Sequence, residues 1–94
     1  RAPLITLHPA SPNPFNSSTV LSWSLPHGAL ATVEVFDVLG RRVKVLERRW
    51  MDRGIQRAIW NGTDETGAHA GSGVYMIRLT SGKTVLHAKA LLMR

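Results

Sequence analysis

A chain of 94 residues can form one hydrophobic core but not two, and its 44% hydrophobic residues exclude a disordered segment. The absence of cysteine excludes disulfides and thiolate metal sites, and no apolar run reaches the ~18–20 residues of a membrane span. The net charge of +6 favours acidic partners through long-range attraction.

The chain is expected to be one module of a longer protein. It begins at Arg1, which is not an initiator residue. We therefore expect residues 1–94 to form a single domain that follows another part of the same protein.

The first third of the chain predicts an extended lead-in and then a strand. Three prolines follow the weakly alternating segment 4–7, and they fix φ and remove backbone donors, as in an extended or edge segment. Residues 19–25 have the period of two of a half-buried strand. Its apolar side holds Thr19, Leu21, Trp23 and Leu25.

Residues 31–46 predict a β-hairpin. The segment 31–37 alternates and is rich in β-branched residues, Asp37–Gly40 supplies the turn, and 42–46 returns antiparallel. From Glu47 to Gly54 the pattern is unclear, and we expect Trp50 and Met51 to plug one end of a sandwich. A basic face is also expected, because seven basic residues fall within a short stretch: Arg41, Arg42, Lys44, Arg48, Arg49, Arg53 and Arg57.

The second half predicts three more strands. Residues 56–60 alternate, with Trp60 toward the core, and Asn61-Gly62 opens a long polar connection to Gly73. Residues 74–80 place Tyr75 on the apolar face, and 84–93 form the last strand. Six or seven strands separated by Gly or Pro are typical of an all-β antiparallel sandwich.

No catalytic site is predicted. The carboxylates are spread over turns and strand exteriors, so we interpret them as solvated surface groups: Glu34, Asp37, Glu47, Asp52, Asp64 and Glu65. The four histidines lie in separate segments without the spacing of a zinc site. We therefore expect no catalytic residues and no cofactor.

Two binding alternatives remain weaker than their structural interpretations. The oxygens of Asn61 and Asp64 could surround calcium, but Asp64 and Thr66 are better explained as caps of the turn. The basic stretch with Trp50 and Trp60 could bind nucleic acid, but a solvated basic face is favoured, and no nucleic-acid partner is predicted.

Four motifs in fixed order resemble a known family. They are Pro12–Asn16, Val35–Val43, Trp60–Gly67 and Ser72–Tyr75. The set is similar to the type A C-terminal sorting domains of the type IX secretion system. These domains are Ig-like β-sandwiches related to the Ig-like domain of the flagellar hook-capping protein, so the resemblance implies an Ig-like antiparallel β-sandwich of about seven strands.

The resemblance also assigns roles to residues. Most motif residues are expected to specify the fold: Pro12, Asn13, Pro14, Phe15, Asp37, Gly40, Arg41, Trp60, Gly62, Asp64, Gly67, Gly73 and Tyr75. The last strand and the basic end are similar to the family's recognition segment: Lys89, Leu91, Leu92, Met93 and Arg94. Asn61 stands where the family usually has aspartate, and the chain ends in arginine where lysine is common.

The function implied is that of an export signal. The partners would be outer-membrane secretion and sorting proteins and an N-terminal cargo in the same chain, which would cross the periplasm to the cell surface or medium. Two alternatives stay open. One is a structural domain of a flagellar hook scaffold. The other is an accessory carbohydrate-binding module, which would need exposed coplanar rings from among Trp23, Trp50, Trp60 and Tyr75.

Overall fold

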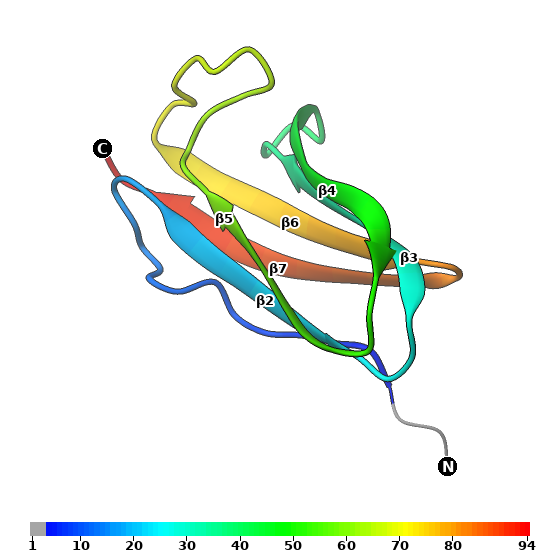
Figure 1. Cartoon of the computed structure of the whole chain (residues 1–94). Helices are drawn as coiled ribbons and strands as arrows, with labels where there is room; N and C mark the ends of the chain where they lie inside the picture. The colour runs from blue at the N-terminus through cyan, green and yellow to red at the C-terminus, as the bar shows by residue number, and fades with distance from the viewer. Residues whose placement is uncertain (1–3) are drawn as a thin grey trace.

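The computed structural model describes residues 4–94, and this part of the chain is built of strands without helices (Figure 1). Arg1, on which the expectation of a preceding segment rests, and the other first residues of the expected 1–94 domain lie outside the described residues. The strands are β1 (Thr6–Leu7), β2 (Thr19–Leu25), β3 (Ala29–Phe36), β4 (Arg42–Met51), β5 (Gly54–Trp60), β6 (Gly73–Ser81) and β7 (Thr84–Leu92).

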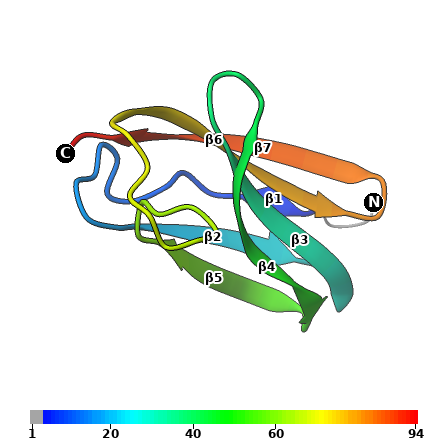
Figure 2. The same cartoon turned by 90° about the horizontal axis from the view of Figure 1, so that it is seen from above.

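Two sheets face each other (Figure 2). One has the order β1-β2-β5 and the other the order β4-β3-β6-β7, and every pair of neighbouring strands is antiparallel. In the constant-type immunoglobulin arrangement the fourth strand lies with the first, second and fifth; here β4 lies beside β3 instead. The expected Ig-like antiparallel sandwich of about seven strands is confirmed.

The alternating segments lie where the sequence predicts them. In β2 the buried residues are Thr19, Leu21, Trp23 and Leu25, and in β6 they are Tyr75, Ile77, Leu79 and Ser81. Burial at every second position follows from the pleat, because one face of each strand packs against the other sheet. The predicted strand ends differ from the observed ones by at most two residues, except in β4.

Two tryptophans form the centre of the core, and both have no exposed surface. The Trp23 Nε1–H donates to the Met51 Sδ at 3.3 Å, and the Trp60 Nε1–H donates to the Thr63 carbonyl at 2.9 Å. A buried aromatic side chain removes roughly 150–250 Å² from water, which stabilises the fold by about 4–6 kcal/mol as an upper bound. The indole hydrogen bonds avoid the cost of a buried unpaired donor.

The segment expected to be irregular is the second half of β4. Met51 is fully buried, as expected, but Trp50 is 62% exposed, so the prediction that both plug the sandwich is wrong for Trp50. Adjacent residues of a strand point to opposite faces, and therefore only one of the two can enter the core. The Trp50 indole covers Gly28, where an added Cβ would lie 2.8 Å from its ring.

The prediction of one basic face is also wrong. Arg48 pairs with Thr32 and Arg49 pairs with Ala31, so these neighbouring arginines lie on opposite faces of β4. Arg57 lies on β5, in the other sheet. Inward-pointing charges are common on edge strands, where they prevent pairing with other chains, and β4 is one of the two edge strands of its sheet.

Glu34 was expected to be solvated, but it is only 6% exposed. Its carboxylate lies between the Arg78 Nη2 at 3.1 Å and the Arg42 Nη1 at 3.4 Å, and the Arg78 guanidinium also covers the Phe36 ring at 4.3 Å. Long arginine side chains on the adjacent strands cover the shorter Glu34 even though it faces away from the core. The alternation of the sequence predicts the face of the strand on which Glu34 lies, but it does not predict that Glu34 is buried.

The contrast between Trp50 and Met51 can be tested by substitution. We expect Met51→Ala to lower the free energy of unfolding by about 2–5 kcal/mol, because it opens a cavity and leaves the Trp23 donor unpaired. Trp50→Ala should cost less than about 1 kcal/mol. Urea unfolding measures both, and equal losses for the two variants would contradict the assigned faces.

Candidate functional site

The sequence motifs and the last residues of the chain meet at one end of the sandwich, where Figures 1 and 2 place the C terminus beside the loop between β5 and β6. We call this region the motif end. It comprises Pro12–Asn16, Asp37–Arg41, Asn61–Gly73, Tyr75 and Lys89–Arg94.

The Pro-Asn-Pro-Phe segment lies along the outer edge of β7. The Asn13 Nδ2 donates to the Lys89 carbonyl at 3.0 Å, and the Asn13 Oδ1 accepts from the Leu91 N–H at 2.9 Å. The Phe15 N–H then donates to the Leu91 carbonyl at 3.0 Å, and the Phe15 carbonyl accepts from the Met93 N–H at 2.8 Å. The side-chain amide of Asn13 and the backbone of Phe15 thus cover this part of β7, which is an edge strand.

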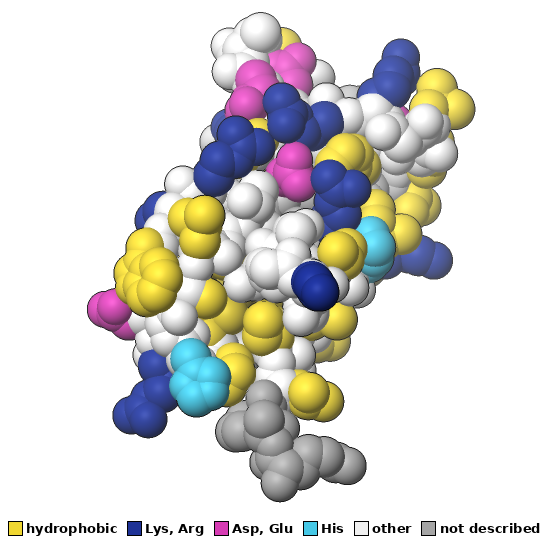
Figure 3. Space-filling model, turned by 90° about the vertical axis from the view of Figure 1, so that its right-hand side faces the viewer, with side chains coloured by type: hydrophobic (Ala, Val, Ile, Leu, Met, Phe, Trp, Pro, Cys, Tyr) yellow, Lys and Arg dark blue, Asp and Glu magenta, His cyan; other side chains and the backbone are white. Residues whose placement is uncertain are grey.

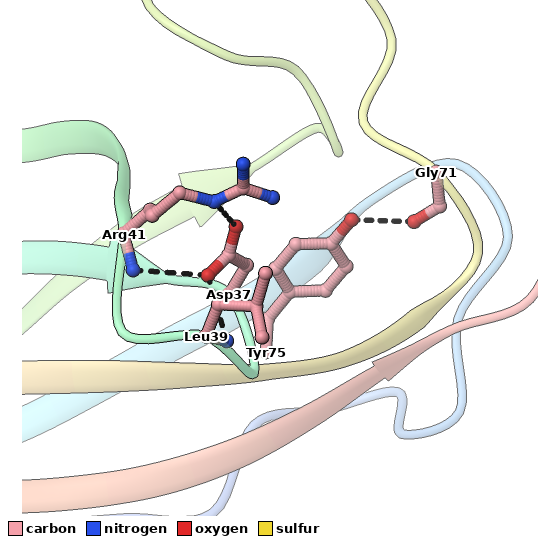
Figure 4. Close-up of polar contacts among 5 residues, drawn as sticks. All are labelled: Asp37, Leu39, Arg41, Gly71 and Tyr75. Atoms are coloured by element: carbon pink, nitrogen blue, oxygen red, sulfur yellow. Dashed lines mark hydrogen bonds and ion pairs between the residues drawn. The ribbon is translucent and has the colours of Figure 1, made fainter.

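Three aromatic rings join three of the motifs. The Trp60 ring contacts Phe15 at a centroid distance of 5.5 Å and Tyr75 at 4.9 Å, both in edge-to-face geometry. Each such pair is worth about 0.5–1.5 kcal/mol beyond the area it buries. The Tyr75 hydroxyl donates to the Gly71 carbonyl, which ties β6 to the preceding loop (Figure 4).

Asp37 organises the turn between β3 and β4 (Figure 4). Its Oδ1 accepts from the backbone N–H groups of Leu39 and Arg41, each at 2.9 Å, and its Oδ2 accepts from the Arg41 Nε at 2.8 Å. Gly40 has a φ of 80°, which side chains disfavour. The hydrogen bond from the Arg41 N–H is the main cause that lowers the pKa of Asp37, with the Arg41 side chain adding to it.

Asp64 caps the next turn. Its Oδ1 accepts from the Thr66 hydroxyl at 2.7 Å, the Thr66 N–H at 2.9 Å and the Ala68 N–H at 3.1 Å. The Thr66 hydroxyl is the largest cause that lowers the pKa of Asp64, and the Lys44 charge adds to it. Asn61 binds the Thr63 hydroxyl at 2.6 Å instead of joining Asp64. The turn-cap interpretation therefore describes the geometry of this loop.

The expected recognition segment is largely part of the fold. Leu92 is fully buried, Leu91 is half-buried, and Lys89 and Met93 are exposed. The backbone N–H of Arg94 donates to the Ser72 hydroxyl at 2.9 Å. Lys89, Met93, Arg94 and part of Leu91 remain on the surface, and of these Arg94 is held by hydrogen bonds to the fold.

The Arg94 side chain holds the loop between β5 and β6. Its Nη2 donates to the Gly62 carbonyl at 2.6 Å and its Nε to the Ala70 carbonyl at 3.1 Å, while the Ala70 N–H donates to the same Gly62 carbonyl at 2.8 Å. Gly62 has a φ of 73°, and a Cβ there would lie 2.5 Å from the Arg94 Nη2. The sequence predicts glycine at position 62 because the turn needs a positive φ. The closeness of the Arg94 side chain is a second reason, because it leaves no room for a Cβ.

Hydrophobic side chains of β6 that sequence patterns do not single out lie next to the motif end, beside Val38 of its β3–β4 turn. Val38 and Val74 are exposed, and with Met76 they line a groove on the outer face of the sheet. The sequence feature that could have predicted this groove is the presence of hydrophobic residues at alternate positions of β6 on the face away from the core, such as Val74 and Met76.

The remaining candidate binding groups do not converge. Of the four aromatic candidates for a sugar platform, Trp23 and Trp60 are fully buried, Tyr75 is 8% exposed, and only Trp50 is open. Within residues 4–94 no three His, Asp or Glu side chains lie close enough together to hold a metal ion. No helix in that range is suited to crossing a membrane.

Comparisons with known proteins identify relatives of this fold. The family model described as "Secretion system C-terminal sorting domain" matches residues 10–93. The search of curated proteins gave no match. The crystal structure of dimeric latent PorU from Porphyromonas gingivalis contains a similar fold, with a TM-score of 0.75 and 19% identity over 99% of this chain. The match covers 10% of the PorU chain.

The Asp64 cap predicts a pH-dependent stability. The pKa of Asp64 lies below its ordinary 3.8, so its ionised form stabilises the fold above pH 3.8, and this contribution disappears as the pH falls through the lowered pKa. We expect Asp64→Asn to be less stable than the unmodified chain at neutral pH and to approach it in acid. Urea unfolding across this range measures the difference. The neighbouring exposed Glu65→Gln is the control, and a pH-independent loss in Asp64→Asn would refute the electrostatic cause.

The Arg94 contacts predict a local loosening when they are removed. Arg94→Ala should raise the hydrogen-exchange rate of the Ala70 amide several-fold, because the Gly62 and Ala70 carbonyls lose their shared donor. The amide of Leu79 in the centre of β6 should not change. Exchange followed by NMR tests this, and an unchanged rate at Ala70 would show that Arg94 does not hold the loop.

Proposed function

The chain belongs to the secretion system C-terminal sorting domain family, and we propose that its motif end is the surface by which the export machinery reads it. Domains of this family are C-terminal sorting signals of type IX secretion, and that role implies export to the cell surface or medium. The resemblance inferred from the four motifs is confirmed. The domain itself is not catalytic.

The observation that carries the proposal is the attachment of the last residues to the fold. Leu92 is in the core, Asn13 and Phe15 cover the β7 edge, and Arg94 binds the loop carbonyls. The motif residues and the terminal segment therefore have fixed relative positions. Such an arrangement supports recognition of a folded surface, in which little conformational entropy is lost on binding.

The geometry also suits a domain that follows its cargo. Figure 1 shows the beginning of the described chain and the C terminus at opposite ends of the molecule, whose longest extent is 42 Å. A cargo joined before Leu4 would leave the motif end open. We propose that residues 1–94 are the C-terminal module of such a protein. It would cross the periplasm and be read by outer-membrane sorting proteins, with any enzymatic activity residing in the cargo.

Within the motif end, Lys89 and Met93 are the side chains best placed for contact. Both project from the terminal segment and are exposed, whereas Leu92 and Arg94 are engaged with the fold. The two alternative functions have no such support. A carbohydrate-binding module lacks a platform of exposed rings within the described residues, and no observation points to a hook scaffold.

The proposal predicts export of a fusion protein. A periplasmic reporter joined to residues 1–94 should reach the surface or medium of a type IX-competent host. The double substitution Lys89→Ala and Met93→Ala should reduce export about tenfold or more, since losing roughly 1.4 kcal/mol of binding changes affinity tenfold. The fraction of reporter outside the cells, measured by immunoblot, decides the outcome.

Point substitutions are preferable to deletion of residues 89–94, because deletion removes the buried Leu92 and the Arg94 contacts together. Lys83→Ala, at the tip of the β6–β7 hairpin, is a matched control that should be exported normally. Normal export of the double variant would exclude these two side chains as contacts, and retention of the unmodified fusion in the periplasm would refute the sorting function of this chain.

A further inference from the structure

A groove of about 430 Å³ opens on the outer face of the larger sheet, beneath the turn between β3 and β4. Its apolar lining comes from Phe36, Val38, Val74 and Met76, and it also touches Tyr75 of the motif end. Val38 is 74% exposed and Val74 is 37% exposed. The groove is therefore an accessible recess with apolar walls, next to the terminal strand.

Arginine, lysine and histidine side chains border this groove. Arg78 and His87 line it and are cross-strand partners, and Lys89 is the partner of Met76. Because directly paired residues share a face, these side chains lie on the same outer surface. The whole outer face of the sheet carries four Lys or Arg side chains, Arg42, Arg48, Arg78 and Lys89, against one carboxylate, Glu34.

The carboxylates near the groove are already engaged. Glu34 binds two arginines, and Asp37 binds the Arg41 side chain and the backbone of its own turn. The border therefore keeps positive charge that the chain does not neutralise, and Figure 3 shows Lys and Arg side chains spread among hydrophobic ones on the side of β3 and β4.

From this complementarity we propose that the groove receives an apolar side chain from an acidic segment of the export machinery. The proposal rests on the sorting function proposed above and specifies the chemistry of the partner. An apolar recess favours an aliphatic or aromatic anchor, and the basic border favours carboxylates beside that anchor. The position beside Lys89 makes the groove continuous with the exposed part of the terminal segment.

A second copy of this chain fits the groove poorly. The net charge of +6 makes two copies repel each other. Of the six acidic residues, four are engaged: Glu34, Asp37 and Glu47 bind arginine, and Asp64 caps its turn. Asp52 and Glu65 remain, and they lie in two separate turns or loops. Residues 1–94 therefore offer few free carboxylates to the border, and an acidic segment of a different protein suits it better than a second copy of this domain.

The test uses the reporter fusion in a type IX-competent host. Met76→Glu places a carboxylate in the groove and should reduce export about tenfold or more, as expected for loss of one anchor contact. Ile59→Glu is the matched control, because Ile59 is 66% exposed on the other sheet. His87→Glu, on the border, should also reduce export, whereas His27→Glu, in the turn before β3, should not.

The unmodified fusion separates this inference from the sorting function. If the unmodified fusion is exported, and the Met76→Glu and His87→Glu variants are exported equally well, the groove proposal is wrong while the sorting function stands. If the unmodified fusion is retained, the sorting function fails first. Val38→Glu replaces Met76→Glu if that variant does not fold, since Val38 lies in an exposed turn.

Sedimentation of the purified domain tests the alternative occupant. A dimer that Met76→Glu disperses would assign the groove to a second copy and overturn the proposal.

Discussion

The packing of Trp60 between Phe15 and Tyr75 is the contact on which the rest of the motif end depends. It joins the lead-in segment, the end of β5 and the start of β6, which are far apart in the sequence. The indole N–H also fixes the Thr63 carbonyl, so the same ring positions the beginning of the loop between β5 and β6. Together with the hydrogen bonds between Ser11 and Val20 and from the Thr19 hydroxyl to the Pro12 carbonyl, this contact fixes the position from which the lead-in segment covers β7.

The terminal segment is therefore a structural element and a recognition surface at once. Its backbone pairs with Phe15 and with the Asn13 side chain, and Arg94 returns to the loop that begins after Trp60. A recognition surface of this kind exists only in the folded domain. A partner that reads it reads several distant segments together, which is a stricter requirement than a short linear peptide provides.

The electrostatic arrangement follows from how few carboxylates the chain has. Most of them neutralise an arginine or cap a turn, so the lysines and arginines that remain give the molecule its positive surface. Glu34 shows the physical reason, because a buried carboxylate requires paired charges and takes two arginines for itself. The positive charge that no carboxylate neutralises is left on the outer face of the larger sheet, beside the apolar groove.

The sequence by itself determined the strands with clear alternation, the turn at Asp37–Gly40, the core positions of Trp23 and Trp60, and the family. Each of these depends on local periodicity, on turn chemistry or on motif order. Tertiary structure alone decided that Trp50 is exposed, that Glu34 is buried, that the basic residues of β4 occupy two faces, and that Arg94 binds the Gly62 and Ala70 carbonyls. The burial of Glu34 and the faces taken by the β4 residues depend on which residues are neighbours across strands, and the Arg94 contacts depend on the loop that lies beside the C terminus. The register shifts between β3 and β4 change those neighbours without leaving a trace in the alternation of a single segment.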